Sequence, residues 1–229
     1  MATGGKSKSG ASKPQRTASS QRWLKRQHSD PFVAEARDKG YRSRAAFKLI
    51  EIDDKFRLLT GGKAILDLGA APGGWSQIAA LRVKAGEPRG GIVVAADLTP
   101  IEPIGGVTDL VMDLHDAKST AVLRKHLPDG ADVVLSDMAP QATGHRSVDF
   151  LRSAALAESA FATAEDVLKP GGAFVVKVMR SGADVDLEKD LKRKFREVKA
   201  FKPKSSRQDS AEMYLVARGY RPISGEPAT

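Results

Sequence analysis

The sequence predicts an α/β protein with a mostly parallel, doubly wound sheet. Short apolar runs that are typical of buried strands alternate with longer segments of helical periodicity between residues 45 and 200. The last two strand-like runs, 198–201 and 213–217, are joined by a turn. Parallel strands need a longer crossover, so the turn indicates that the final strand is antiparallel. With 229 residues, the chain is long enough for one such domain with tails and too short for two.

The predicted elements follow one another in a regular order. Seven strands are predicted, at 64–68, 91–96, 107–112, 132–136, 173–178, 198–201 and 213–217. Helices are predicted at 44–52, 75–81, 120–127, 148–168 and 187–195, after a short amphipathic helix or pair of turns between 21 and 37. Ser43 is placed to cap the helix that begins at residue 44, and Pro170-Gly171-Gly172 is a stop signal for the longest helix.

A glycine-rich turn directly follows the first predicted strand. The strand contains the acidic residue Asp67, and residues 69–75 read Gly-Ala-Ala-Pro-Gly-Gly-Trp. In open α/β sheets, ligands bind at the carboxyl ends of the strands, where glycines let the backbone come close to them. The glycine spacing differs from the G-x-G-x-x-G pattern of dinucleotide sites, so a nicotinamide cofactor is not expected.

Acidic residues also follow the next two predicted strands. Asp97 follows the second strand and Asp113 the third. A carboxylate at the first of these positions can accept hydrogen bonds from two ribose hydroxyls, and one at the second can accept from an adenine amino group. The sequence therefore predicts a small-molecule site at this edge of the sheet. Its candidate residues are Asp67, Gly69, Ala71, Pro72, Gly73, Gly74, Trp75, Asp97, Leu98, Asp113 and Asp137.

Composition and charge limit the other classes of function. The chain has no cysteine, four histidines without metal-ligand spacing, no apolar run of membrane-spanning length and no hydrophobic stretch of signal-peptide type at its start. We therefore expect a cytoplasmic protein without disulfides, metal or membrane contact. Of the formal net charge of +9, seven positive charges lie in residues 1–29, which contain no acid. Residues 1–20 are expected to be disordered and to contact phosphates.

Four charged residues lie where exposure to solvent does not readily explain them. They are Lys48 on the helix before the first strand, Asp137 after the fourth strand, Lys177 within the fifth and Glu212 at the start of the seventh. A lysine within the apolar run 174–178 is costly to bury unless it is paired. Glu212, on a neighbouring strand, is the natural counter-charge.

The glycine-turn motif Asp67-x-Gly69-x-x-Pro72-Gly73 resembles the first motif of class I S-adenosylmethionine-dependent methyltransferases, which have a Rossmann-like fold. Over residues 21–220 the chain resembles the FtsJ-type heat-shock ribosomal RNA methyltransferases. The resemblance is carried by Arg22-Trp23-Leu24, by residues 40–49, 67–77, 136–140 and 175–178, and by the run 202–207 leading to Glu212-Met213-Tyr214. It implies methyl transfer from S-adenosylmethionine to the 2′-oxygen of a uridine ribose in large-subunit rRNA, in support of ribosome assembly.

The resemblance also implies a catalytic role for the four charged residues, because ribose 2′-O-methyltransferases of this type have a Lys-Asp-Lys-Glu tetrad. A ribose hydroxyl is a poor nucleophile until its proton is removed. Lys177 is the candidate base, Asp137 and Glu212 would orient it, and Lys48 would position the ribose. Candidate RNA-binding residues are Arg22, Lys25, Arg26, Arg42, Arg44, Lys202, Lys204 and Arg207.

The expected organisation is a basic tail (1–20), a methyltransferase domain (21–220) whose residues 21–60 form an RNA-binding helical extension, and a flexible C-terminus (221–229). The expected partner is rRNA within the large ribosomal subunit or its precursor, bound by a monomer. Two alternatives remain open: a tRNA 2′-O-ribose methyltransferase with the same tetrad, and an RNA-binding assembly factor that has lost catalysis. A base or protein methyltransferase is disfavoured, because Asp137-Met138-Ala139-Pro140 stands where an Asn/Asp-Pro-Pro-Tyr/Phe loop would be expected.

Overall fold

A seven-stranded sheet forms the centre of the computed structural model, which describes residues 30–180 and 184–222. Its strands are β1 (Ala64–Leu68), β2 (Ile92–Asp97), β3 (Val107–Val111), β4 (Ala131–Ser136), β5 (Leu168–Met179), β6 (Phe195–Phe201) and β7 (Glu212–Tyr220). Their order in the sheet is β3-β2-β1-β4-β5-β7-β6. The first five strands pair in parallel, and β7 is antiparallel to both of its neighbours. The predicted fold class is confirmed.

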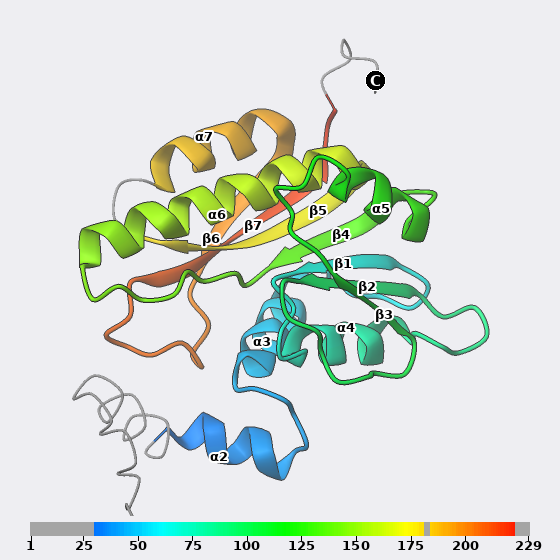
Figure 1. Cartoon of the computed structure of the whole chain (residues 1–229), viewed down its shortest axis with the longest axis horizontal. Helices are drawn as coiled ribbons and strands as arrows, with labels where there is room; N and C mark the ends of the chain where they lie inside the picture. Colours follow the sequence, from blue (N-terminus) through cyan, green and yellow to red (C-terminus); the bar gives the residue numbers. More distant parts are fainter. Residues whose placement is uncertain (1–29, 181–183, 223–229) are drawn as a thin grey trace, which may run out of the picture.

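Helices cover both faces of the sheet (Figure 1). On one face lie α3 (Ala45–Phe56) and α4 (Gly74–Val83), and on the other lie α5 (Ser119–His126), α6 (Arg146–Val167) and α7 (Asp184–Lys194). One apolar cluster fills each side, because the buried strands carry apolar residues toward both faces. The short helix α2 (Pro31–Asp38) precedes α3 and lies outside these layers.

The boundary between α6 and β5 differs from the prediction. Sequence reasoning ended the helix at Leu168 and began the strand at residue 173, after the Pro-Gly-Gly stop signal. Instead Leu168 has extended backbone and already pairs with Ala131 in β4. The strand continues through the Pro-Gly-Gly segment with a register shift before Ala173 pairs with Val133. A stop signal for the helix is therefore compatible with an irregular strand.

Two further predictions about the ends of elements were wrong. β6 begins at Phe195, which sequence reasoning assigned to the preceding helix, because this ring is buried and pairs with Tyr220 of β7. Ser43 does not cap α3, whose N-cap residue is Arg44 and makes no side-chain capping bond. The Ser43 hydroxyl instead lies only 2.4 Å from the position that a Cβ on Gly74 would occupy. A side chain on Gly74 would therefore displace the Ser43 hydroxyl.

Asp67 places a carboxyl group inside the sheet. It lies in the middle of the fully buried β1, and the Ser76 hydroxyl of α4 donates a hydrogen bond of 2.6 Å to it. Burial raises the pKa of Asp67 to about 7, outweighing the Ser76 hydrogen bond, and the nearby carboxylates Asp137 and Asp97 act in the same direction. Asp67 therefore joins β1 to the first turn of α4 through a group that titrates near neutral pH.

The pKa of Asp67 predicts how the variant Asp67→Asn behaves. Between pH 4 and 7 the folded protein keeps a proton that the unfolded chain has lost, so this group makes the folded state less stable as pH rises through that window. The free energy of unfolding of the wild type should therefore fall relative to that of Asp67→Asn between pH 5 and 8, by about 1–3 kcal/mol. Urea titrations at several pH values measure this difference. A difference that does not change with pH would contradict the raised pKa.

Candidate active site

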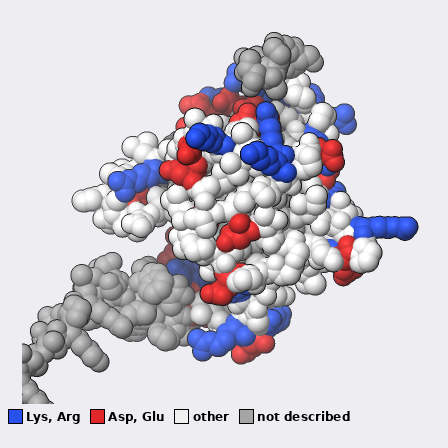
Figure 2. Space-filling model, turned by 45° about the vertical axis from the view of Figure 1, so that its right-hand side comes forward, with Lys and Arg blue, Asp and Glu red and all other residues white. Residues whose placement is uncertain are grey.

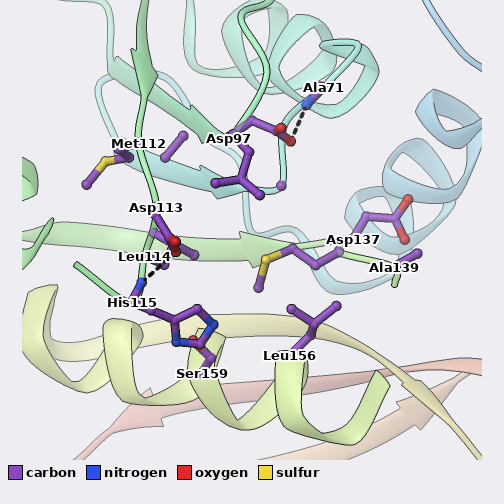
Figure 3. A pocket seen from close by; sticks show the side chains of 14 residues that line it. Ala71, Asp97, Met112, Asp113, Leu114, His115, Asp137, Ala139, Leu156 and Ser159 are labelled. Atoms are coloured by element: carbon purple, nitrogen blue, oxygen red, sulfur yellow. Dashed lines mark hydrogen bonds between the residues drawn. The ribbon is translucent and has the colours of Figure 1, made fainter. Parts of the chain in front are cut away.

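A pocket of about 340 Å³ lies at the carboxyl ends of β1, β2 and β4 and beside the segment after β3. Figure 3 shows its lining, with Asp97 and Asp113 on one side and α6 on the other. The lining residues are Gly69, Ala71, Ala96, Asp97, Leu98, Met112, Asp113, Leu114, His115, Asp137, Met138, Ala139, Leu156 and Ser159. The pocket is thus placed where open α/β sheets bind small molecules.

The glycine turn brings the backbone after β1 against the end of β4. Gly69 has φ +72°, and a Cβ built on it would lie 2.3 Å from Cγ of Met138. Any other residue would be strained in this conformation and would also collide with Met138. Gly69 therefore lets two strand ends approach each other closely at the bottom of the pocket.

The two acids after β2 and β3 are held by backbone amides. Asp97 accepts hydrogen bonds from the amides of Ala71 (3.0 Å) and Thr99 (2.8 Å), and Asp113 accepts one from His115 (2.9 Å; Figure 3). A carboxylate has about four acceptor sites, so both groups keep capacity for a ligand. The Ala71 contact also ties the glycine turn to β2.

The four charged residues singled out in the sequence lie together beside the pocket as two ion pairs. Lys177 Nζ lies 3.0 Å from Asp137 Oδ1 and donates to the Asp137 carbonyl oxygen at 2.6 Å. Lys48 Nζ lies 2.7 Å from Glu212 Oε1. Both lysines are buried. Because a buried ammonium is costly unless it is paired, the carboxylate beside each lysine offsets the cost of its burial.

The phenol of Tyr214 joins the two ion pairs. Its hydroxyl lies 2.7 Å from Asp137 Oδ1 and 3.5 Å from Glu212 Oε1, and the Lys48 ammonium lies 5.7 Å from its ring centre. Burial and the two carboxylates raise the pKa of Tyr214 well above its usual value, so the hydroxyl keeps its proton and donates. Tyr214 was not among the predicted site residues. Its position two residues after Glu212 in a strand, which places both side chains on one face, was the signal available.

Asp137 belongs to both the ion-pair network and the pocket. Burial acts to raise its pKa, but the ammonium groups of Lys177 and Lys48 and the Tyr214 hydrogen bond outweigh burial and hold the pKa below its usual range. The carboxylate is therefore charged at neutral pH and can hold Lys177 while lining the pocket. Asp137 therefore contacts both the pocket and the buried ion-pair network.

The structure divides the predicted cofactor-binding residues into two groups. Gly69, Ala71, Asp97, Leu98, Asp113 and Asp137 line the pocket, whereas Asp67, Pro72, Gly73, Gly74 and Trp75 do not. Trp75 is buried instead, and its indole donates to the Ala45 carbonyl (2.8 Å) while its ring contacts Tyr214. Sequence reasoning missed the opposite wall, Leu156 and Ser159, because nothing in the pattern of α6 distinguishes its pocket face.

The predicted RNA-binding residues are dispersed. Arg22, Lys25 and Arg26, with the predicted tail and the C-terminal residues 223–229, lie outside the described residues. Arg42 donates to the carbonyls of Pro72, Glu102 and Pro103, and Lys202 to those of Gln208 and Ser210, so both brace loops. Lys204 lies in the turn between β6 and β7, and its backbone amide donates a hydrogen bond to the Glu51 carboxylate of α3. Figure 2 shows small basic groups interleaved with acidic ones on the face that it presents.

Arg44 and Arg207 lie apart from these braces, at a second hollow beside the ion pairs. This groove of about 200 Å³ is lined by Arg44, Lys48, Arg207, Ser210 and Glu212. It shares the Lys48–Glu212 pair with the network described above. The network thus lies between two hollows, one lined by carboxylates and apolar side chains and one lined mainly by cations.

Two kinds of site are not found in the described ranges. Within residues 30–180 and 184–222, no group of three His, Cys, Asp or Glu side chains is arranged to hold a metal ion. None of the helices in those ranges is long and apolar enough to cross a membrane.

Comparison with known proteins gives one consistent result. The model of a family described as FtsJ-like methyltransferase matches residues 41–220. Proteins named Ribosomal RNA large subunit methyltransferase E are similar: that of Bradyrhizobium diazoefficiens is 56% identical over 206 residues (90% of each chain), and that of Nitrobacter hamburgensis 55% over 213 residues (93% of this chain, 92% of the relative). A crystal structure described as a ribosomal RNA methyltransferase of Plasmodium falciparum superposes with a TM-score of 0.70 at 32% identity, covering 79% of this chain and 98% of that one. The chain therefore belongs to the FtsJ-like methyltransferase family.

Proposed function

We propose that this protein transfers a methyl group from S-adenosylmethionine to the 2′-oxygen of a uridine ribose in large-subunit (23S) ribosomal RNA. The observation that carries the proposal is the network of two lysine–carboxylate pairs joined by Tyr214 between the pocket and the basic groove. The relatives' name, Ribosomal RNA large subunit methyltransferase E, supports rRNA over tRNA as the substrate. The intact network argues against an assembly factor without catalysis.

The pocket fits S-adenosylmethionine in its chemistry. Its walls are largely apolar, and its carboxylates lie at the ends of successive strands. Asp97 would accept hydrogen bonds from the ribose hydroxyls, Asp113 from the adenine amino group, and Asp137 would lie toward the methionine end. When bound, the cofactor would supply an electrophilic methyl group on a positively charged sulfur.

The residues of the network supply what a ribose hydroxyl needs. Lys177 Nζ is fixed by the side chain and the carbonyl of Asp137, so its position is set before RNA binds. In its neutral form this amine would accept the proton of the 2′-hydroxyl. Lys48, held by Glu212 and facing the groove, would position the ribose and stabilise negative charge on its oxygen.

The remaining assignments follow from this reaction. We assign residues 21–220 to the methyltransferase domain and residues 21–60 to its RNA-binding extension, with the basic residues before position 30 adding phosphate contacts. The relatives from Bradyrhizobium diazoefficiens and Nitrobacter hamburgensis are bacterial proteins named for ribosomal RNA, which supports a cytoplasmic location. We further propose a monomer that acts without a metal.

Mapping of 2′-O-methylation tests the proposed function. In a strain that lacks this protein, one ribose in large-subunit rRNA should lose its methyl group, and the purified protein with S-adenosylmethionine should restore it. Loss of a mark only in tRNA would favour the tRNA alternative. An unchanged pattern in both RNAs would leave the protein without the assigned reaction.

Asp97→Ala tests the cofactor site. The variant loses the acceptors predicted for the ribose hydroxyls, and hydrogen bonds to charged groups contribute about 1.5–3 kcal/mol. Binding of S-adenosylmethionine, measured by calorimetry, should weaken by that amount. Asp129→Asn, an exposed acid at the opposite end of the sheet, is the control. Wild-type affinity in Asp97→Ala would remove this residue from the site.

Lys177→Ala tests the proposed base. A positioned proton acceptor contributes roughly 10²- to 10⁴-fold, so single-turnover methyl transfer should slow by at least that factor while the cofactor still binds. Lys177→Arg should be nearly as slow, because a guanidinium does not deprotonate in proteins. If the arginine variant keeps about a tenth or more of the wild-type rate, Lys177 acts only by position and charge.

Tyr214→Phe tests the link between the ion pairs. The variant keeps the buried ring against Trp75 but removes the hydroxyl that donates to Asp137. A lost hydrogen bond to a charged group corresponds to roughly a tenfold to hundredfold slower reaction, which single-turnover assays measure. A rate within about twofold of the wild type would make the hydroxyl a structural group only.

A further inference from the structure

Asp30 connects three segments at the edge of the basic groove. One of its carboxylate oxygens, Oδ1, caps α2 by accepting from the Phe32 amide at 3.1 Å. The other, Oδ2, is shared by two arginines: it pairs with Nη1 of Arg44, and it lies 3.4 Å from both Nε and Nη2 of Arg207. The Asp30 side chain is only 8% exposed. A single buried carboxylate therefore holds together the start of α2, the start of α3 and the turn between β6 and β7.

The two arginines converge on this carboxylate. Burial, followed by the charge of Arg207, lowers the pKa of Arg44, which reflects the repulsion between the two guanidinium groups. Arg44 is also held by the Ser205 carbonyl, and its buried Nε has no hydrogen-bond partner among the described residues. Arg207 is held more loosely by its 3.4 Å contacts, and its side chain is 37% exposed. Without Asp30, the exposed Arg207 would be free to move away from Arg44.

Among the described residues, the three cations around the groove share two carboxylates. Lys48 is paired with Glu212, and Arg44 with Asp30, so Arg207 is the cation that the local carboxylates do not fully balance. The groove has a volume of about 200 Å³. This is several times the roughly 30 Å³ that one water molecule takes up. Such a groove accommodates a group with a single negative charge and several acceptor oxygens, directly beside Lys48. A phosphodiester of an RNA chain has these properties.

We propose that Asp30 is a positioning residue that sets Arg44 and Arg207 as a clamp for one phosphodiester of the RNA, next to the ribose presented to Lys48. This inference rests on the proposed function, since it takes RNA as the substrate. Guanidinium groups bind phosphates with two parallel hydrogen bonds, and this geometry requires a fixed orientation. Asp30 supplies the orientation for both arginines while also fixing the entry to α2.

The variant Asp30→Asn isolates the charge of Asp30. Asparagine caps helices as well as aspartate does, so α2 keeps its cap while the arginines lose their counter-ion. The RNA is large-subunit rRNA, free or in whole large subunits, from cells that lack their own enzyme of this kind. With this substrate, KM for RNA should rise about tenfold, a change of about 1.4 kcal/mol. The value of kcat at saturating RNA should stay within about twofold and cofactor affinity should not change. Asp54→Asn is the control, because Asp54 lies at the other end of α3 and pairs with Arg82 of α4. This variant removes an equal charge and should behave as the wild type.

A second variant distinguishes positioning of Arg207 by Asp30 from a general effect of Asp30 on folding. Arg207→Gln should weaken RNA binding. It should also reduce the steepness of the plot of log binding constant against log salt concentration by about one, which corresponds to the loss of one phosphate contact. In the Asp30→Asn background the same change should cost less than about threefold, because the clamp is already disordered. Independent, additive effects would overturn the inference. So would tighter RNA binding by Asp30→Asn, since the carboxylate would then be a competitor of the phosphate.

The readouts keep this inference distinct from the proposed function. Salt-dependent RNA binding needs no methyl transfer, so a reduced slope in Arg207→Gln with an inactive wild type would support the clamp and reject the reaction. Methyl transfer by the wild type, with KM and salt slope unchanged in both variants, would reject the clamp and leave the reaction in place.

Discussion

The buried phenol of Tyr214 is the group through which the charged residues of the site depend on one another. Removing two ammonium groups and two carboxylates from water is costly, and their mutual attraction offsets that cost only when the geometry is good and the remaining acceptors are satisfied. Tyr214 donates its one hydroxyl proton to Asp137 at 2.7 Å and lies 3.5 Å from Glu212, so its dipole is close to both carboxylates. Because it stays protonated, it adds no charge of its own to the network. Four charges can thus remain close together in a nearly dry position.

The register of the sheet determines where this phenol lies. Lys177 of β5 is directly opposite Tyr214 of β7, and Met179 is opposite Glu212. In an antiparallel pair, opposite residues lie on the same face, so this register places the lysine, the phenol and the second carboxylate together. A shift of one residue would turn Tyr214 and Glu212 to the other side of the sheet. The apolar runs on both strands, buried on two faces, fix the register and therefore also fix the site.

The alternation of strands and helices, the glycine turn and the anomalous charged residues could be predicted because each depends on a local pattern. The strands of the core are short apolar runs, and the lysine within residues 174–178 is anomalous in any buried strand. The wall formed by Leu156 and Ser159 could not be predicted, because it depends on how α6 is rotated over the sheet. The role of Asp30 could not be predicted either. Before the fold was known, nothing related it to Arg207, which is 177 positions away in the chain.

The last strand in the described part of the chain does not lie at the edge of the sheet. β7 is inserted between β5 and β6, and β6 is hydrogen-bonded to the sheet only through it. Until β7 is in place, β6 has no strand to join, Lys48 lacks its partner Glu212, and Asp137 lacks the hydroxyl of Tyr214. A chain without its last strand would keep the strand ends that line the pocket but would lack Glu212 and the phenol that joins the two ion pairs. The strand order thus makes completion of the sheet a condition for the complete network and, under the proposed function, for methyl transfer as well.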